Sequence, residues 1–456
     1  MKIGFSAANI TPSYGMERPG GTGKAYHQGI NDQCWASAAY IGDGESAIAV
    51  VGLDTLSVRH SVCDAARDII QDAIGLPPDC VMFGASHTHS GGPIAHEGFA
   101  SEANEDYARH LARQSATAVI DAHRRAQELL IGVGTGEATG VAHPRRWHLT
   151  DGRMVSHPRS QFRDLMDRPH CEQDETVGVV GASDAEGNLR GCIVNFPCHG
   201  TTGLGVGGAS SSDWIHFLRT ALKGVFGEDF GVVFVNGACG DITQVDNTAP
   251  DDYVQSGPLA ARRVGMTVAG EALKVLVQMG FHDGVPVAGA RRVIKLQPRE
   301  ITDEMLDWAE AHLESDEVVE GRWFPDRVWA REWIEMARMN EEEPEIPAEL
   351  QALTIGRAAF VSNPAEYFCA LAMDIKRGSN FRPTFPVSLA NGCIGYVATR
   401  DAYADTYLPP EGVPFTGGYE TTPARSSKVA PGSGEQIAQA CIELVNSMAL
   451  PEDSPV

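Results

Sequence analysis

Basic residues are scarce in this sequence of 456 residues. Lysine and arginine together number 36, against 60 aspartates and glutamates, and the formal net charge is −24. A surface with this balance repels the phosphates of nucleic acids and the headgroups of anionic lipids. The charge therefore argues against nucleic acid or a membrane as a partner and favours a small-molecule substrate.

Long apolar segments are also missing. No run of eighteen apolar residues occurs, so no segment of the sequence predicts a membrane-spanning helix. The first twelve residues, which end at Pro12, contain no apolar core of a secretory signal. We therefore expect a cytoplasmic protein.

Several common site motifs are absent as well. The ten cysteines are scattered without a Cys-x-x-Cys pair, which argues against a closed structural zinc site and favours buried free thiols. The sequence has no Gly-x-Ser-x-Gly motif and no phosphate-binding Walker loop. A nucleophilic-elbow hydrolase and a P-loop enzyme are therefore excluded.

Short β-branched runs alternate with helical patterns through most of the chain. This alternation predicts an α/β fold, with a layered mixed sheet and flanking helices in a single large domain over 1–456. Turn residues at 184–188 predict antiparallel pairing of the strands on either side. The predicted strands cover 47–54, 80–85, 129–134, 176–182, 189–196, 232–235, 351–361 and 386–398. The predicted helices cover 61–74, 102–124, 213–226, 257–279, 365–376 and 434–448.

The stretch 301–350 differs from the rest in charge. It holds sixteen acidic and four basic residues, so its net charge of −12 is half that of the chain. We interpret it as a helical acidic insertion in which Trp329 and Trp333, four residues apart, cover the core. The alternatives are a lid over a site or a dimer contact, which leaves a homo-oligomer open.

Histidines and a glutamate follow three of the predicted strands. His87 and His89 come after strand 80–85, His199 follows 189–196, and Glu366 follows 351–361. Residues at i and i+2 can face the same side, and sites in α/β folds are built at strand ends. Histidine and carboxylate ligands with an open position suit catalytic zinc. Convergence of these residues would make a metal site, whereas a histidine pair that only packs at a strand end is the alternative.

A set of short motifs resembles the catalytic domain of the neutral, non-lysosomal ceramidases. The resemblance runs from end to end, without the C-terminal β-sandwich that the ceramidases carry. The motifs are Ala-Asn-Ile-Thr-Pro at 8–12, Gln-Gly-Ile at 28–30, Ala-Ser-His-Thr-His-Ser-Gly at 85–91, Asn-Phe-Pro-Cys-His-Gly at 195–200, Gly-Ala-Cys-Gly-Asp at 237–241, Asn-Pro-Ala-Glu at 363–366 and Gly-Tyr-Val-Ala-Thr at 395–399.

The resemblance implies one zinc ion held by His87, His199, Glu366 and Tyr396. His89 would then lie beside the metal rather than on it. From there it could donate a hydrogen bond to an oxyanion or exchange a proton with the reacting group.

Three further positions bear on the chemistry. The resemblance implies that Arg145 faces the substrate, whereas a surface arginine is the alternative. Asp241 could help to manage protons, or it could only cap the backbone amides of a tight turn. Gly237 stands where ceramidases have a serine proposed to take part in catalysis. This difference favours a small soluble substrate over ceramide.

These inferences lead to the hypothesis of a zinc-dependent hydrolase that cleaves an amide bond of a small N-acyl-type compound. Zinc lowers the pKa of its bound water from about 15.7 to about 7, which makes a serine nucleophile dispensable. Two alternatives stay open. One is a metal-dependent lyase or isomerase that polarises a carbonyl, and the other is a non-catalytic metal-binding protein with 301–350 as its partner surface.

Overall fold

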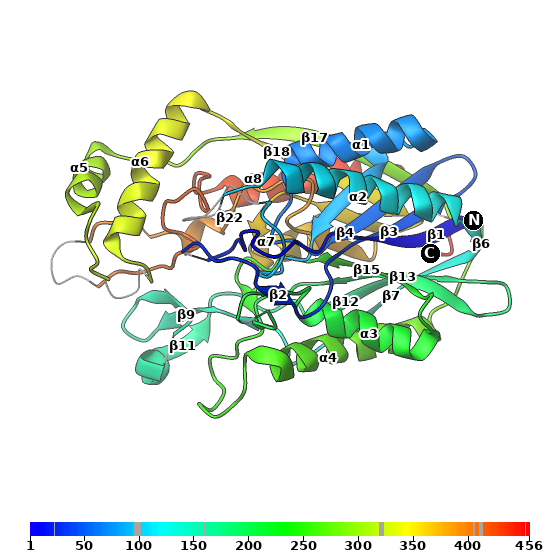
Figure 1. Cartoon of the computed structure of the whole chain (residues 1–456), viewed down its shortest axis with the longest axis horizontal. Coiled ribbons are helices and arrows are strands. Elements are labelled where there is room, and N and C mark those ends of the chain that lie inside the picture. The colour runs from blue at the N-terminus through cyan, green and yellow to red at the C-terminus, as the bar shows by residue number, and fades with distance from the viewer. Residues whose placement is uncertain are drawn as a thin grey trace.

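The computed structural model of the chain describes all residues except 22, 95–101, 159, 206, 319–322, 405, 410–413 and 452. Two β-sheets lie face to face, and a layer of helices covers the outer side of each (Figure 1). The predicted α/β class with flanking helices is confirmed. Among the described residues, no helix combines the length and the apolar character that crossing a bilayer requires.

The first sheet is mixed, because β4 (Ala47–Leu53) runs parallel to β5 (Val81–Ala85) whereas β1 (Lys2–Asn9) and β3 (Trp35–Gly42) pair antiparallel. Helices α1 (His60–Ile74) and α2 (Glu105–Arg124) pack on its outer face with their alanine, leucine and valine side chains buried. In order across the sheet, the strands are β5 (Val81–Ala85), β4 (Ala47–Leu53), β3 (Trp35–Gly42), β1 (Lys2–Asn9) and β6 (Gln127–Glu128).

The second sheet contains the predicted antiparallel pair around the turn at 184–188, and this prediction is confirmed. Its outer face is covered by α3 (Trp214–Phe226) and α4 (Gly257–Gln278). The two sheets approach closely at Gly52, where a Cβ atom would lie 2.1 Å from the carbonyl oxygen of Phe234. The strands, in order, are β15 (Gly231–Asn236), β13 (Leu189–Phe196), β12 (Thr176–Ser183) and β7 (Leu130–Glu137).

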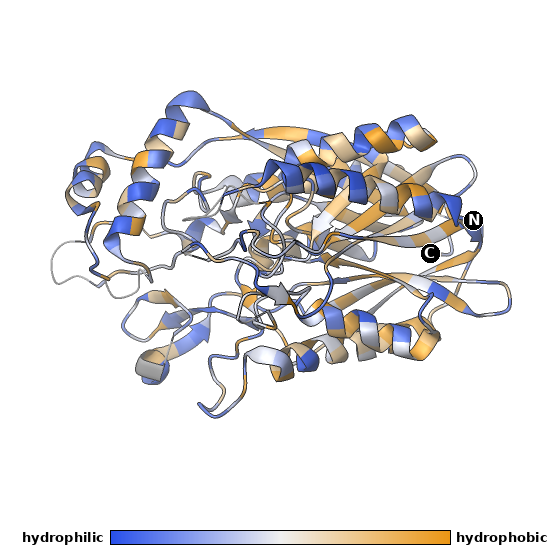
Figure 2. Ribbon diagram, viewed as in Figure 1, coloured by the Kyte–Doolittle hydropathy of each residue, from blue (hydrophilic) through white to orange (hydrophobic). Residues whose placement is uncertain are grey.

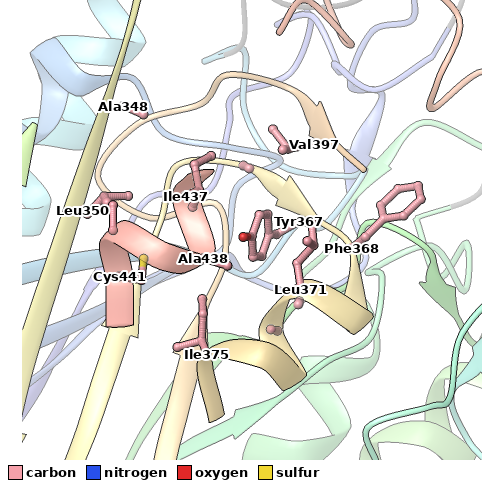
Figure 3. Close-up of a cluster of buried hydrophobic side chains, with 14 of the residues drawn as sticks. Ala348, Leu350, Tyr367, Phe368, Leu371, Ile375, Val397, Ile437, Ala438 and Cys441 are labelled. Carbon is pink, nitrogen blue, oxygen red and sulfur yellow. The ribbon is translucent and has the colours of Figure 1, made fainter. Parts of the chain in front are cut away.

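A third sheet, together with α7 (Cys369–Gly378) and α8 (Ser433–Asn446), encloses a further core. In Figure 3 the side chains of Leu371 and Ile375 on α7 lie near those of Ile437 and Cys441 on α8. The Tyr367 hydroxyl donates a hydrogen bond to the Gly434 carbonyl at the start of α8 (2.6 Å). The strands, in order, are β17 (Val287–Leu296), β18 (Ile346–Ile355), β19 (Ala358–Ser362) and β21 (Thr384–Val387).

Two predicted strands are wrong in their extent. The strand expected over 351–361 is an antiparallel hairpin of β18 and β19, because Gly356 takes a left-handed φ of 57° and reverses the chain. The strand expected over 386–398 is broken between β21 and β22 (Tyr396–Val397), where Leu389 and Asn391 take left-handed φ values of 51° and 60°. These turns rest on backbone conformations that apolar patterning does not reveal.

The acidic insertion is helical as predicted but ends earlier, since β18 begins at Ile346. It consists of α5 (Asp303–His312) and α6 (Asp326–Glu342), which lie at the end of the molecule away from both termini (Figure 1). Trp329 and Trp333 are fully buried, which confirms that they cover a core. Figure 2 shows hydrophobic residues concentrated in the strands between the helix layers and many hydrophilic residues along the helices.

Four small sheets complete the described structure, and two of them contribute to the site below. The pairs run parallel in β14–β2 and β20–β22 and antiparallel in the others. Their strands are β10 (Met154–Ser156), β9 (Arg146–Leu149) and β11 (Met166–Pro169), then β14 (Ala209–Ser210) with β2 (Gly29–Ile30), β16 (Ile242–Thr243) with β8 (His143–Pro144), and β20 (Glu366–Tyr367) with β22.

Candidate metal centre

The loops that follow β5 and β13 lie side by side and carry the predicted histidines. A parallel bridge joins Thr88 to Gly200, and the backbone N–H of His89 donates to the Gly200 carbonyl (3.2 Å). Asn236, at the end of β15, ties the loops together by donating its side-chain amide to the carbonyls of Ser86 (3.1 Å) and Cys198 (3.0 Å). The convergence of strand ends predicted from the sequence is therefore present.

His87, His89, His199 and Glu366 form one group, called here the histidine cluster. A ring nitrogen of each histidine lies within 4.8 Å of a ring nitrogen of the other two. The Nε2 atom of His87 lies 3.4 Å from Nε2 of His89 and 3.2 Å from Oε2 of Glu366. The same carboxylate oxygen lies 3.6 Å from Nε2 of His199. Nitrogen and oxygen donors thus meet at one point.

Backbone carbonyls hold the other nitrogen of each ring. Nδ1 lies 2.7 Å from the Leu56 carbonyl in His87, 3.1 Å from that of Ile242 in His199, and 3.1 Å from that of Gly20 in His89. A neutral imidazole carries a single N–H, so donation from Nδ1 leaves the lone pair on Nε2. This assignment turns three Nε2 lone pairs toward the centre of the cluster, as in metal-binding histidines with a fixed tautomer.

The pKa shifts favour the neutral rings that metal binding requires. Burial and the nearby charge of Arg145 together lower the pKa of His199 to about 4. Burial also holds the pKa of His89 well below its ordinary value, with His87 and His199 adding to the effect. Both rings are therefore uncharged at neutral pH.

Glu366 and Tyr396 are register partners on β20 and β22, so their side chains start side by side. Burial raises the pKa of Tyr396, and the negative charge of Glu366 adds to this rise. The Oε2 atom of Glu366 is buried without a hydrogen-bond partner. A cation between this oxygen and the Nε2 atoms would satisfy it, so the residues present fit a metal ion.

Arg145 is buried beside the cluster rather than exposed on the surface. Its Nη1 atom lies 3.3 Å from Nε2 of His199, while Nε donates to Oε1 of Glu420 (2.9 Å) and Nη2 donates to the Gly240 carbonyl (2.7 Å). The guanidinium also lies over the rings of Tyr396 (5.4 Å) and Tyr419 (5.1 Å). The structure therefore brings Arg145 to the site, and Glu420 balances its charge.

Asp241 does not reach the cluster. Its Oδ1 atom accepts a hydrogen bond from the backbone N–H of Cys369 (2.8 Å), and its Oδ2 atom accepts one from the Cys171 thiol (3.2 Å). Its carbonyl accepts from the N–H of Arg145 (2.9 Å). These contacts agree with the structural alternative, in which Asp241 caps backbone amides and positions its neighbours.

A cavity of about 500 Å³ opens above the histidine cluster. Beside the predicted residues, its lining includes His157, Gln244, Trp323, Phe324 and Tyr419. None of these five residues was assigned to the site from the sequence. Trp329 and Trp333 share a four-residue spacing that places them on one helix face, and Trp323 does not share it. This difference was the signal in the sequence that could have given Trp323 a separate role.

Gly237 lies in the turn after β15, outside the lining of this cavity. A Cβ atom at this position would lie 2.9 Å from Cβ and 3.0 Å from the backbone nitrogen of Pro197. The turn therefore packs closely against Pro197, and a serine would need the backbone to shift.

Within the described part of the chain, one further group of metal-ligating side chains occurs, called here the second cluster: His60, Asp64 and Glu349. Arg67 donates to both oxygens of Glu349 (2.7 and 3.2 Å), and Arg291 donates to Oε2 of the same residue (3.0 Å). Because two arginines already balance its two carboxylates, the second cluster is an ion-pair network.

No protein-family model matches this sequence, and no curated protein matches it. Two solved structures are similar in fold. One is neutral ceramidase from Pseudomonas aeruginosa, with a TM-score of 0.72 at 18% identity over 100% of this chain and 75% of that chain. The other is a ceramidase complexed with C2, with a TM-score of 0.71 at 17% identity over 98% of this chain and 75% of that chain. The resemblance predicted from the motifs is confirmed at the level of structure, and this chain has the fold of the neutral ceramidases.

Proposed function

We propose that this chain is a zinc-dependent hydrolase that cleaves an amide bond of a small N-acyl compound. The observation that carries the proposal is the set of three Nε2 atoms directed at one point beside the unpartnered Oε2 of Glu366. This point lies at the base of a cavity large enough for a small molecule. The fold similarity to ceramidases, a class of enzymes named for amide cleavage, agrees with it.

In this proposal His87, His199, Glu366 and Tyr396 hold the ion. Bound zinc lowers the pKa of a water ligand to about 7 and so supplies a nucleophile at neutral pH. The ligand set of nitrogen and oxygen donors suits zinc, and the open cavity above it leaves a position for water or substrate.

His89 is the proposed proton carrier. Its ring is held through Nδ1 by the Gly20 carbonyl, which leaves the lone pair of Nε2 to accept a proton from the attacking water. The same nitrogen can then donate that proton to the departing amine as the carbon–nitrogen bond breaks. The products are a carboxylate and an amine, so water supplies all the atoms that the bond cleavage requires.

Arg145 is the proposed oxyanion donor. Glu420, Gly240 and two aromatic rings fix the guanidinium, so its orientation costs nothing further when substrate binds. Nη1, which faces His199, is the remaining donor group of the guanidinium on the side of the histidine cluster and would donate to the carbonyl oxygen of a substrate. Asp241 acts in this scheme only by positioning Arg145 and Cys369.

The charge of −24 and the cavity volume support a compact substrate in the cytoplasm over ceramide in a membrane.

A panel of N-acyl amines in water enriched in oxygen-18 tests the reaction. We expect one heavy oxygen in the product carboxylate, loss of turnover after chelation, and recovery when zinc is returned. His60→Ala, in the second cluster, is the matched control and should keep turnover. Product without the isotope would contradict hydrolysis and favour a lyase or isomerase, and turnover that survives chelation would contradict the metal.

A further inference from the structure

Aromatic rings form one side of the cavity above the histidine cluster. From Tyr396 the ring centroids lie 5.9 Å from Tyr419, and Tyr419 lies 6.1 Å from Trp323 and 6.0 Å from Phe324. These four residues, called here the aromatic wall, all line the cavity. The rings therefore run without a break from a predicted metal ligand to the acidic insertion.

The insertion is docked firmly enough to hold its part of this wall. Glu332 on α6 binds Arg425 through both carboxylate oxygens (2.7 and 3.1 Å), and the Trp333 indole donates to the Pro423 carbonyl (2.9 Å). The contacted loop is the one that carries Tyr419. Trp323 takes a φ of 72°, a conformation that non-glycine residues rarely adopt and that surrounding packing must stabilise.

The residues that line the cavity provide little uncompensated positive charge for binding an anionic group. Arg145 is the one arginine or lysine among the described residues that line it, and its charge is balanced by Glu420. Glu366 adds a negative charge at the base. The part of a substrate that packs against the aromatic wall is therefore uncharged and apolar.

A second hollow of about 400 Å³ adjoins the cavity and shares His157, Val245 and Trp323 with its lining. Its other lining includes Asp246, Asn247 and Gln255, which are polar. The two spaces together offer an apolar inner part and a polar outer part, with Trp323 between them.

We propose that Trp323, Phe324 and Tyr419 bind an aromatic ring that is joined by a short spacer to the scissile amide, and that the polar remainder of the substrate extends into the outer hollow. Ring–ring contacts in offset or edge-to-face geometry add stabilisation beyond the area buried, which selects an aromatic ring over an alkyl group of equal size. The identification of a scissile amide rests on the proposed function, whereas binding of the ring requires no metal.

Binding of phenylacetamide to the protein as purified, followed by NMR titration, tests the ring site. We expect it to bind several-fold more tightly than cyclohexylacetamide, and we expect Trp323→Leu to weaken it about tenfold while Trp323→Phe retains most of the affinity. Equal affinity for the two amides, or no effect of Trp323→Leu, would overturn the proposal, as would a failure of phenylacetamide to bind.

Trp308→Leu is the matched control, because Trp308 stacks on His312 (4.3 Å between centroids) in the same insertion but does not line the cavity. Affinity should stay within about twofold of the wild type, and a tenfold loss here would mean that loosening of the insertion, not loss of a ring contact, explains the result. The same titration on His87→Ala separates the two proposals. Ring binding retained by zinc-free His87→Ala leaves the ring site standing without the metal, whereas ring binding by a wild-type protein found to contain no zinc contradicts the proposed function alone.

Discussion

The histidine cluster and the second cluster contain the same kinds of side chain and differ in what surrounds them. Both place imidazole nitrogens beside carboxylate oxygens at hydrogen-bonding or longer distances. Around Glu349, however, the guanidinium groups of Arg67 and Arg291 donate hydrogen bonds to the carboxylate. Oε2 of Glu366 has histidine neighbours and no hydrogen-bond partner.

The comparison indicates that a metal site differs from an ion-pair network in whether its carboxylate is already paired with arginine, more than in which types of side chain it contains. A carboxylate that arginines already satisfy gains little from a cation, while a buried unsatisfied oxygen gains a great deal. The predictions below test this contrast.

Removing the carboxylates should affect stability very differently in the two clusters. Glu349→Ala leaves the buried Arg67 without its main partner, and we expect the free energy of unfolding to fall by about 3–5 kcal/mol. Glu366→Gln in chelated protein removes an unsatisfied charge, and we expect a loss below about 1 kcal/mol. Urea unfolding of both variants measures the difference. Equal losses would mean that Glu366 is as fully compensated as Glu349.

Glu420 is an arginine-paired carboxylate within the site and should behave like Glu349. Burial raises its pKa, but Arg145 and Arg146 outweigh burial and lower it from 4.5 to about 2. A lowered folded-state pKa stabilises the protein above the unfolded value and loses that effect as the pH falls from about 4.5 toward 2.

We therefore expect Glu420→Gln to lower the free energy of unfolding by about 3 kcal/mol at pH 7, with a difference that narrows below about pH 4.5. Unfolding curves recorded across that range measure it. Glu443→Gln, which alters an exposed pair with Arg292, is the control and should leave stability unchanged. A deficit that is independent of pH would show that shape, not charge, explains the Glu420 contacts.

The two arginines should separate into a kinetic and a structural role. Arg145→Lys should reduce kcat about 10²-fold with zinc retained, because a lysine cannot reproduce the held guanidinium donor. Arg67→Lys should lower the unfolding midpoint and leave kcat within twofold, about 0.4 kcal/mol. Turnover and metal content measured on both variants give the answer, and an Arg145→Lys protein with wild-type kcat would exclude an oxyanion role.

Gly237→Ser should have a modest effect on stability and none on turnover. The new side chain would crowd Pro197, and we expect a cost of about 1–3 kcal/mol in unfolding free energy without added activity. Thermal midpoints and turnover measure both effects. A gain in turnover would mean that this position can supply a nucleophile, contrary to a reaction carried out by water.

Much of the site was predictable because its residues follow strands of regular pattern. His87, His199 and Glu366 could be identified as candidates because each follows a strand of regular pattern, although the strands belong to different sheets. Tyr396 could not be reached in this way, because β22 is two residues long and pairs with β20 only in the folded chain. Its assignment depended on the family resemblance.

The aromatic wall and the second cluster could not be predicted. Trp323 and Phe324 reach the cavity because α6 docks on the loop at 415–427, through contacts between residues some 90 positions apart. The pairing of Arg67 with Glu349 spans 282 positions. Hydrophobic periodicity reports local structure, so neither long-range contact left a pattern in the sequence.

Elemental analysis of the purified wild type, His87→Ala, His199→Ala and His60→Ala tests the central claim most directly. We predict about one zinc per chain in the wild type and in His60→Ala, and loss of zinc in the other two variants. Metal-free wild-type protein, or zinc retained in both His87→Ala and His199→Ala, would contradict the assignment of the histidine cluster as the metal centre.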